Sequence, residues 1–340
     1  MSSTVVHRSP GRQAAWLAWL ASARAWLFLA VLIVAFEVWA ESADDITFIA
    51  NPFNIRSIAV FAVAPLLLAI GQTFVIISGG IDLSVGFTMG LAAVVVSNVV
   101  NAVTPPVGPV AGLVVGVAAA IAASVVPGLV NGLLIARLRV PPFIGTLGMY
   151  GVARGVAYLL AGGTTVPVSN ETLAWLGNGT IGPFPVVVLF TAVAMLVLHY
   201  VLSHTRFGQY TYAIGGNRAA AVRAGINVRG VTIWIYILSA ICAAIGGILY
   251  AGRFSAGAAQ AGEPLLLDSI AAVVIGGASL FGGSGTIVGT LIGALIVAVI
   301  QYGLVFINVE PFWQFVAVGV VIIISVLVDQ SQRKGGRVDE

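Results

Sequence analysis

Residues 83–136 read LSVGFTMGLAAVVVSNVVNAVTPPVGPVAGLVVGVAAAIAASVVPGLVNGLLIA and contain no charged side chain. A helix that crosses a bilayer needs roughly 20 mostly apolar residues, so this stretch has room for two crossings. Residues 57–78 and 269–309 are also free of charge and have room for one and two more. The whole chain is 59% hydrophobic and 8% charged, against about 25% charged in an average soluble domain. The sequence therefore predicts an all-α, polytopic membrane protein.

Ten apolar stretches are candidate spans of this membrane protein. They lie near residues 25–40, 57–78, 84–102, 108–136, 142–161, 185–203, 231–252, 265–280, 286–307 and 312–328. Lys and Arg accumulate in cytoplasmic loops. Placing both termini in the cytoplasm puts all 15 basic residues on that face except Arg56, Arg154 and Arg253. We expect a cytoplasmic segment over 1–24, a membrane domain over 25–328 and a cytoplasmic tail over 329–340.

Two of these spans leave alternatives open. The first apolar run is short, and Val38-Trp39-Ala40 also fits a signal-peptidase site, although cleavage would leave the other nine spans unchanged. The stretch near 265–280 is also short, so it could re-enter the membrane instead of crossing it. Re-entry would place the basic C-terminal tail outside the cell, and the charge rule therefore favours a crossing.

An internal repeat is one interpretation of two similar apolar segments. Residues 75–95 (VIISGGIDLSVGFTMGLAAVV) and 273–297 (VVIGGASLFGGSGTIVGTLIGALIV) each contain an apolar stretch, a Gly-Gly turn and a Gly-rich return. Their shared richness in Gly, Ala and Val could also produce this likeness without a repeat.

One basic loop interrupts the apolar chain. Residues 204–230 read HTRFGQYTYAIGGNRAAAVRAGINVRG, with four arginines and no acid. After a predicted turn at Gly215-Gly216-Asn217, the run Arg218-Ala219-Ala220-Ala221-Val222-Arg223-Ala224-Gly225 favours a short helix that stops at the glycine. Such a helix could fit a groove on a cytoplasmic partner or lie on anionic membrane lipid through its arginines. Composition alone leaves both interpretations open.

The residue types that soluble enzymes use for chemistry are scarce. A nucleotide-binding P-loop needs Gly-Lys-Ser/Thr, but Lys334 is the only lysine and Gly335 follows it. The three histidines and the single cysteine, Cys242, form no metal-ligand pattern. The sequence predicts no cofactor, no metal site and no nucleic-acid binding. If ATP drives this protein, the ATPase is a separate polypeptide.

Polar side chains within the spans are candidates for a translocation path or for helix packing. Gln72, Thr73, Asn98, Asn131, Thr146, Arg154 and Gln301 could line a path. Polar residues also hold membrane helices together, and Arg154 could instead pair with a buried carboxylate. Asp82 and Asp268 stand where helices are expected to begin, so we expect them to be structural N-caps.

The chain resembles the membrane permease subunits of ribose-type bacterial ABC sugar importers. The resemblance runs from about residue 51 to 329 and rests on five ordered motifs: GQTFVIISGGIDLSVG (71–86), PPFIGTLGMYGVARG (141–155), HTRFGQYTYAIGGN (204–217), AGINV (224–228) and LDSIAAVVIGGASLFGGSGTIVGTLIGALI (267–296). It implies a permease of about ten helices that works as a pair, as a homodimer or with a related permease. It also implies two cytoplasmic ABC ATPase domains and a periplasmic sugar-binding protein.

The resemblance further implies that residues Gly215 to Gly225 are the element that couples the permease to the ATPase. Relatives commonly carry Glu before the Ala-Ala pair, whereas this chain has Arg218, which suggests an acidic counterpart on its own ATPase. Related permeases also handle nucleosides, polyols, a furanose signalling molecule or branched-chain amino acids, and no residue chooses among these substrates. An ATP-independent secondary carrier is the alternative from another class, but intramembrane carboxylates are scarce.

Overall fold

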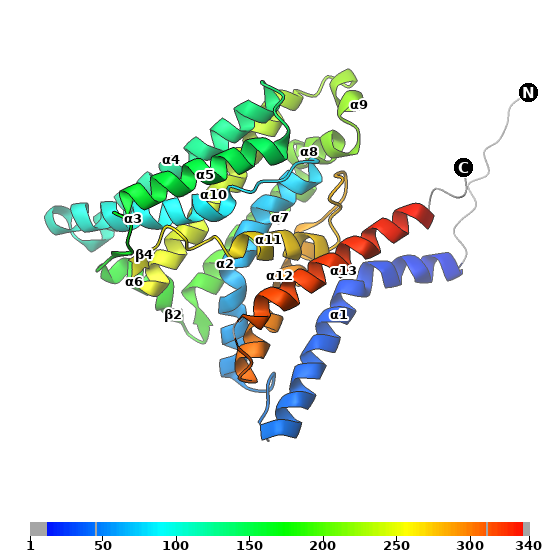
Figure 1. Ribbon diagram of the computed structural model, residues 1–340, viewed down its shortest axis with the longest axis horizontal. Helices are drawn as coiled ribbons and strands as arrows, with labels where there is room; N and C mark the ends of the chain where they lie inside the picture. The colour runs from blue at the N-terminus through cyan, green and yellow to red at the C-terminus, as the bar shows by residue number, and fades with distance from the viewer. Residues whose placement is uncertain (1–11, 45, 311, 336–340) are drawn as a thin grey trace, which may run out of the picture.

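The computed structural model describes residues 12–44, 46–310 and 312–335, and these form a bundle of helices (Figure 1). Eight of the described helices are long and apolar enough to cross a bilayer. They are α1 (Arg12–Asp44), α2 (Pro52–Ile77), α3 (Val85–Val107), α4 (Pro109–Ala136), α5 (Pro142–Leu160), α7 (Val186–His204), α10 (Val228–Phe254) and α12 (Ile287–Phe306). The prediction of an all-α polytopic protein is confirmed.

Five shorter or less apolar helices complete the described fold. They are α6 (Glu171–Asn178), α8 (Arg206–Gly216), α9 (Arg218–Arg223), α11 (Leu265–Ile275) and α13 (Trp313–Gly335). Four two-residue strands form two antiparallel pairs, β1 (Val166–Pro167) with β4 (Ala256–Gly257) and β2 (Thr180–Ile181) with β3 (Phe184–Pro185).

Helices extend into both expected end segments, 1–24 and 329–340. Helix α1 begins at Arg12, well before residue 25, and α13 continues to Gly335, past residue 328. The rest of both expected segments, 1–11 and 336–340, lies outside the described residues.

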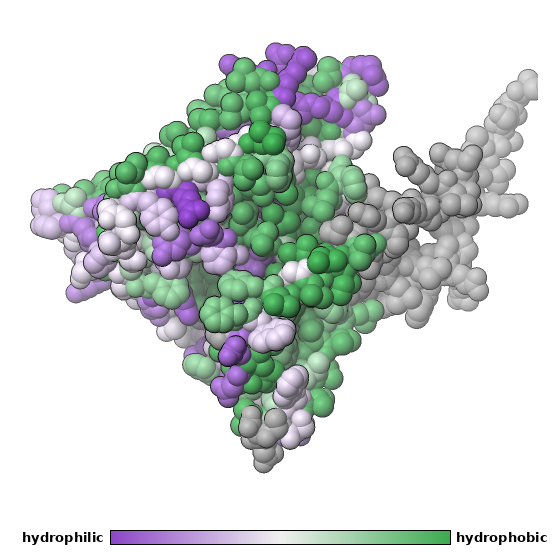
Figure 2. All heavy atoms as spheres, in the orientation of Figure 1, coloured by the Kyte–Doolittle hydropathy of each residue, from purple (hydrophilic) through white to green (hydrophobic). Residues whose placement is uncertain are grey.

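Helix α2 lies at the centre of the bundle. Its residues from Pro65 to Ile77 are nearly all buried, and it packs against α10, α11 and α12. Helix α5 instead leaves most of its apolar side chains exposed, and those of α7 are mostly exposed or half-buried; the face in Figure 2 has large hydrophobic areas. This distribution is that of a central membrane helix surrounded by helices that face lipid or another protein.

Helices α2 and α11 end in the same way. At the end of α2, Gly79 has a φ of +82°, and the Gly80 N–H donates to the Val75 carbonyl. At the end of α11, Gly277 has a φ of +90°, and the Ala278 N–H donates to the Val273 carbonyl. Both are Schellman ends, in which a glycine supplies the left-handed conformation. The two segments proposed as a repeat therefore share their turn geometry.

The segment around α11 crosses the bundle, but only half of it is helical. Its 11 residues span about 16 Å, against a hydrocarbon core of about 30 Å. The run 258–264, a series of turns, precedes it, and β4 before that pairs with β1 between α5 and α6. At the other end, the Gly283 N–H donates to the Ile77 carbonyl beside α8. The crossing favoured by the charge rule is present as a discontinuous span.

Glycines in α3 make room for the run 258–264. A Cβ on Gly90 would overlap the Ala259 carbonyl oxygen, and a Cβ on Gly86 would lie 2.6 Å from the Gly262 carbonyl oxygen. Close backbone approach through small residues is the usual way in which membrane segments pack tightly. The run 258–264 is consequently held at the depth of α3, inside the membrane domain.

Candidate coupling site and membrane path

Three glycine-rich turns meet at the cytoplasmic end of the bundle. The turns contribute Gly79 after α2, Gly215 and Gly216 from α8, and Gly282 and Gly283 before α12; we call these residues the glycine junction. A Cβ on Gly215 would overlap the carbonyl oxygen that ends α2, and a Cβ on Gly282 would lie 3.0 Å from the Gly215 carbonyl oxygen. Backbone therefore lies directly on backbone, so a displacement of α8 pushes on the ends of two spans.

Helices α8 and α9 place the predicted coupling residues above this junction. The predicted turn at Gly215–Gly216 is instead the last turn of α8, because the chain becomes extended only at Asn217, with a φ of −157°. Asn217 caps α9 by accepting from the Ala220 N–H at 2.9 Å. Gly225 follows α9 with a φ of +79°, a conformation that other residues adopt only with strain.

Helix α9 has a buried side and an exposed side. Ala221 is 3% exposed and packs with Ile214 and Val228. The side chains of Arg218, Ala219 and Arg223 are exposed, and Ala220 is half-buried. Burial of the small residue anchors the short helix, so its outer side is presented in a fixed orientation.

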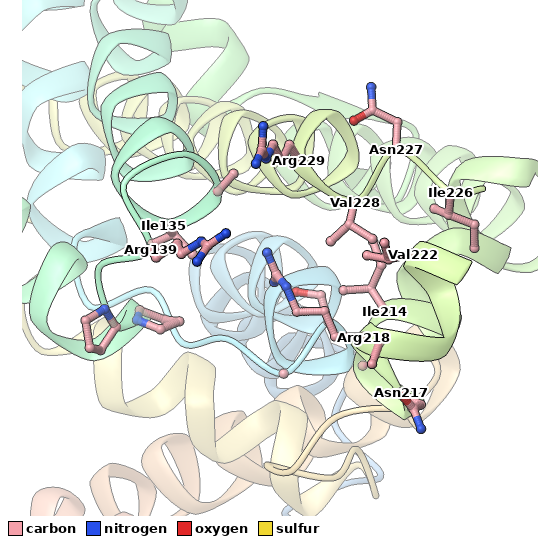
Figure 3. A pocket seen from close by; sticks show the side chains of 18 of the residues that line it. Ile135, Arg139, Ile214, Asn217, Arg218, Val222, Ile226, Asn227, Val228 and Arg229 are labelled. Carbon is pink, nitrogen blue, oxygen red and sulfur yellow. The ribbon is translucent and has the colours of Figure 1, made fainter. Parts of the chain in front are cut away.

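A hollow of about 1040 Å³ opens beside α9, and we call it the basic hollow (Figure 3). Three arginines from different elements line it: Arg139 from the α4–α5 loop, Arg218 from α9 and Arg229 from α10. Arg139 and Arg218 extend toward each other across the hollow in Figure 3. None of the residues that line it is acidic. The hollow is therefore a concentrated positive surface, suited to an acidic partner.

A buried polar network lies just inside the junction and is centred on Asp82. The Asp82 carboxylate accepts hydrogen bonds from the Ser84 N–H at 3.0 Å, the Ser84 hydroxyl at 2.6 Å and the Ser239 hydroxyl at 3.0 Å. Asn131 donates to the Ser84 hydroxyl at 2.9 Å, and Gln72 donates to the Asp82 carbonyl. Burial raises the pKa of the Asp82 carboxyl, while the bonds from Ser84 and Ser239 oppose that shift.

Neither predicted helix-capping aspartate is an N-cap. Helix α3 begins at Val85, and Ser84 occupies its N-cap position, because Asp82 turns back to bond Ser84 and α10. Asp268 is the fourth residue of α11 and accepts from the Gln301 amide at 2.7 Å. Both carboxylates thus connect segments across the bundle.

Most of the predicted path residues are engaged in helix packing. The Thr73 and Thr290 hydroxyls lie 2.7 Å apart between α2 and α12. The Thr146 hydroxyl donates to the Pro142 carbonyl at 2.9 Å, and the Asn98 amide donates to the Leu160 carbonyl at 2.9 Å. These residues do not gather around one cavity, and Gln301 alone among the predicted path residues lines a described hollow.

Arg154 lies in a polar cluster that the sequence analysis missed in part. Its guanidinium lies 5.3 Å from the centre of the Phe87 ring and 6.0 Å from that of Tyr158. The neighbouring Tyr150 hydroxyl donates to Glu263 at 3.1 Å. Glu263 falls between the predicted spans 231–252 and 265–280, but the run 258–264 lies against α3 inside the bundle. The apolar stretch that follows Glu263 is short. This shortness could have indicated that Glu263 itself lies inside the membrane domain.

Comparison with known proteins agrees with this architecture. The family described as "Branched-chain amino acid transport system / permease component" matches residues 54–326. The ribose import permease RbsC of Escherichia coli K12 is 38% identical over 328 residues, 95% of this chain and 98% of that protein. The galactose/methyl galactoside import permease MglC of Haemophilus influenzae is 37% identical over 299 residues, 84% and 89% of the two chains.

The comparison extends to a third relative and to the solved structures. The fructose import permease FrcC of Rhizobium meliloti is 38% identical over 276 residues, 79% of this chain and 75% of that protein. No solved structure shows significant similarity to the chain. The family match covers most of the chain and RbsC covers 95% of it, so this chain is a member of the branched-chain amino acid transport system permease family.

Proposed function

We propose that this protein is the membrane-spanning permease subunit of a bacterial ATP-binding-cassette importer that translocates a sugar. The named relatives import ribose, fructose and galactose or methyl galactoside. A periplasmic binding protein delivers the sugar, and two ABC ATPase domains on separate polypeptides drive its transport. The protein is a multi-pass component of the inner membrane and is not itself the ATPase.

A second permease copy fits an exposed face of α5. Gly148, Gly151 and Gly155 lie on this helix, and a Cβ on any of them would meet nothing within 4 Å. Small residues that face no other helix of their own chain suit the close approach of a partner helix. The homodimer therefore remains our preferred assembly, with a related permease as the alternative.

The glycine junction is the observation that carries the coupling role of residues 215–225. Helix α9 is exposed to the cytoplasm, and α8 rests by its backbone on the end of α2 and on the turn before α12. A bound ATPase would move α9 when it opens and closes. Because no side chains cushion the junction, that movement would reach α2 and α12 directly.

The basic hollow supports an acidic partner surface on the ATPase. Its wall includes the first residue of α9, so an ATPase that holds α9 also covers the hollow. Acidic side chains entering it would satisfy the three arginines and steer association. Charge complementarity thus favours the protein partner over the lipid alternative, since the hollow lies beside the exposed coupling helix.

The test is co-purification followed by a glycine substitution. The tagged protein, solubilised from its native membranes, is expected to bring a Walker-motif ATPase with it. Gly225→Ala places a side chain at a φ of +79°, which costs about 1–2 kcal/mol locally. We expect it to uncouple ATP hydrolysis from transport while insertion is retained.

Gly182→Ala is the matched control for this substitution. Gly182 also has a positive φ, +59°, with nothing within 4 Å of a Cβ, but it lies in the β2–β3 turn. Full substrate-stimulated ATP hydrolysis in the Gly225→Ala transporter would refute the coupling role. Purification of the protein alone, with uptake intact in ATP-free proteoliposomes, would identify a secondary carrier instead.

A further inference from the structure

A second hollow, of about 600 Å³, lies on the other side of the bundle from α9, and we call it the outer pocket. It is bounded by α2, the end of α10, residues 260–265 and α12. Figure 2 shows the hydrophobic face hollowed between α2, β4 and α11. The pocket is of the size that small-molecule sites have, about 300–1,000 Å³.

Polar side chains of several kinds line this pocket. They are Arg253, Gln260, Glu263 and Gln301. A surface that met only lipid would carry none of them, because each costs free energy in hydrocarbon. Their convergence on one hollow, contributed by three separate segments, therefore points to a polar occupant.

Glu263 is the most informative member of the set. It lies inside the membrane domain, since a Cβ on Gly86 of α3 would be 3.4 Å from its Cα. Its Oε1 accepts from the Tyr150 hydroxyl at 3.1 Å. Its Oε2 has no hydrogen-bond partner among the described residues. Tyr150 thus fixes the carboxylate in place and leaves one oxygen free to accept from a ligand.

The remaining wall is mostly apolar and includes three aromatic residues. Phe61, Tyr250 and Phe254 line the pocket, and the rings of Tyr250 and Phe254 lie 4.5 Å apart. Flat rings provide apolar area for the C–H face of a ring-shaped ligand. The Gln301 amide donates to Asp268, which leaves its oxygen as an acceptor toward the pocket.

We propose that the outer pocket is a weak binding site for an uncharged polyhydroxyl compound, a monosaccharide, on its way through the permease. Glu263 and Arg253 balance in charge, so the pocket attracts neither anions nor cations strongly. Hydroxyl groups both donate and accept, which matches a carboxylate, a guanidinium and two amides. The proposal rests on the proposed function and adds a sugar site on the permease itself.

Equilibrium binding to the purified full chain in nanodiscs tests this site. The probes are radiolabelled D-ribose, D-fructose and D-galactose. L-leucine is the probe for the alternative ligand class, an amino acid. We expect saturable sugar binding, weakened roughly tenfold or more by Glu263→Gln, because a hydrogen bond to a charged acceptor is lost. Gln260→Leu, at an exposed position, is expected to weaken binding severalfold without affecting folding.

Glu171→Gln provides the matched control, since Glu171 is an exposed glutamate of α6 outside the pocket. Sugar binding should be unchanged in this variant. Absence of saturable sugar binding, or equal binding by wild type and both pocket variants, would overturn the proposal. Saturable binding of L-leucine in place of sugar would overturn the polyhydroxyl assignment.

Transport by the complete assembly separates failure of the site from failure of the function. With ATPase and binding protein present, Glu263→Gln should slow ATP-driven sugar uptake while the ATPase still co-purifies with the permease. If wild type transports sugar but binds none alone, the outer pocket assignment fails and the permease function stands. If wild type recovers no ATPase and transports no sugar, the proposed function fails as well.

Discussion

The two hollows of this protein differ in charge, and the difference separates two kinds of recognition. The basic hollow carries three arginines and no acid among its lining residues, beside exposed helix α9. The outer pocket combines Arg253 with Glu263, two amides and aromatic rings. An unbalanced positive surface in water suits a charged protein partner, whereas a balanced polar pocket in a membrane domain suits a neutral, hydrogen-bonding molecule.

Backbone packing distinguishes the same two regions. Beneath the basic hollow, the glycine junction leaves no room for a single methyl group at Gly215. Around the outer pocket, the run of turns 258–264 lies between helices, and its Gln260 and Glu263 line the cavity. We infer that the cytoplasmic region transmits force and that the outer region holds a ligand.

The largest effect is expected from Gly215→Ala. A Cβ there would overlap the Ile77 carbonyl oxygen, and overpacking of this kind typically costs about 1–3 kcal/mol. Because the overlap separates α8 from α2, ATP-driven uptake by the complete transporter should fall to background. Gly216→Ala is the control, since a Cβ at the next residue meets nothing within 4 Å. Equal uptake by the two variants would show that the junction does not transmit coupling.

A smaller effect is expected from Arg218→Glu, which reverses one charge in the basic hollow. Loss of a close charge pair across an interface costs about 1.5 kcal/mol or more, or roughly a tenfold weaker affinity for the ATPase. The salt dependence of that affinity should also decrease. Arg137→Glu is the control, because Arg137 is an exposed arginine near the hollow that does not line it. Equal loss of ATPase affinity in both variants would indicate general repulsion instead of a specific site.

Local sequence patterns were sufficient for some elements of this fold. Long apolar runs with few charges predict the eight helices that are long enough to span, because a bilayer demands apolar length. Helix α9 was predicted from an alanine-rich run between Asn217 and Gly225. The preferences of these two residues for helix ends are local properties of the sequence. The family resemblance was likewise readable from short motifs, and it implied the coupling role of residues 215–225 that we propose here.

Other features depend on contacts between distant segments, which no local pattern reports. Asp82 looked like an N-cap, but its carboxylate bonds Ser239, 157 residues away. Glu263 falls outside the predicted spans, because the membrane segment that contains α11 begins with non-helical turns, and hydropathy alone does not reveal this. The basic hollow joins arginines from three separate elements, and one of them, Arg139, entered the predictions only through the positive-inside rule.

The smallest effect is expected from a substitution in the buried polar pair that joins α2 and α12. This substitution tests whether the pair belongs to either hollow. The hydroxyls of Thr73 and Thr290 bond to each other at 2.7 Å, and each also contacts a carbonyl of its own helix. Thr73→Val should cost only about 0.6 kcal/mol of unfolding free energy, since Thr290 keeps a local acceptor. A double-mutant cycle with Thr290→Val, followed by denaturation in detergent, measures this coupling.

Uptake should not change, because neither threonine lines a described hollow. A variant with normal stability but slower uptake would return Thr73 to the translocation path and place that path between α2 and α12.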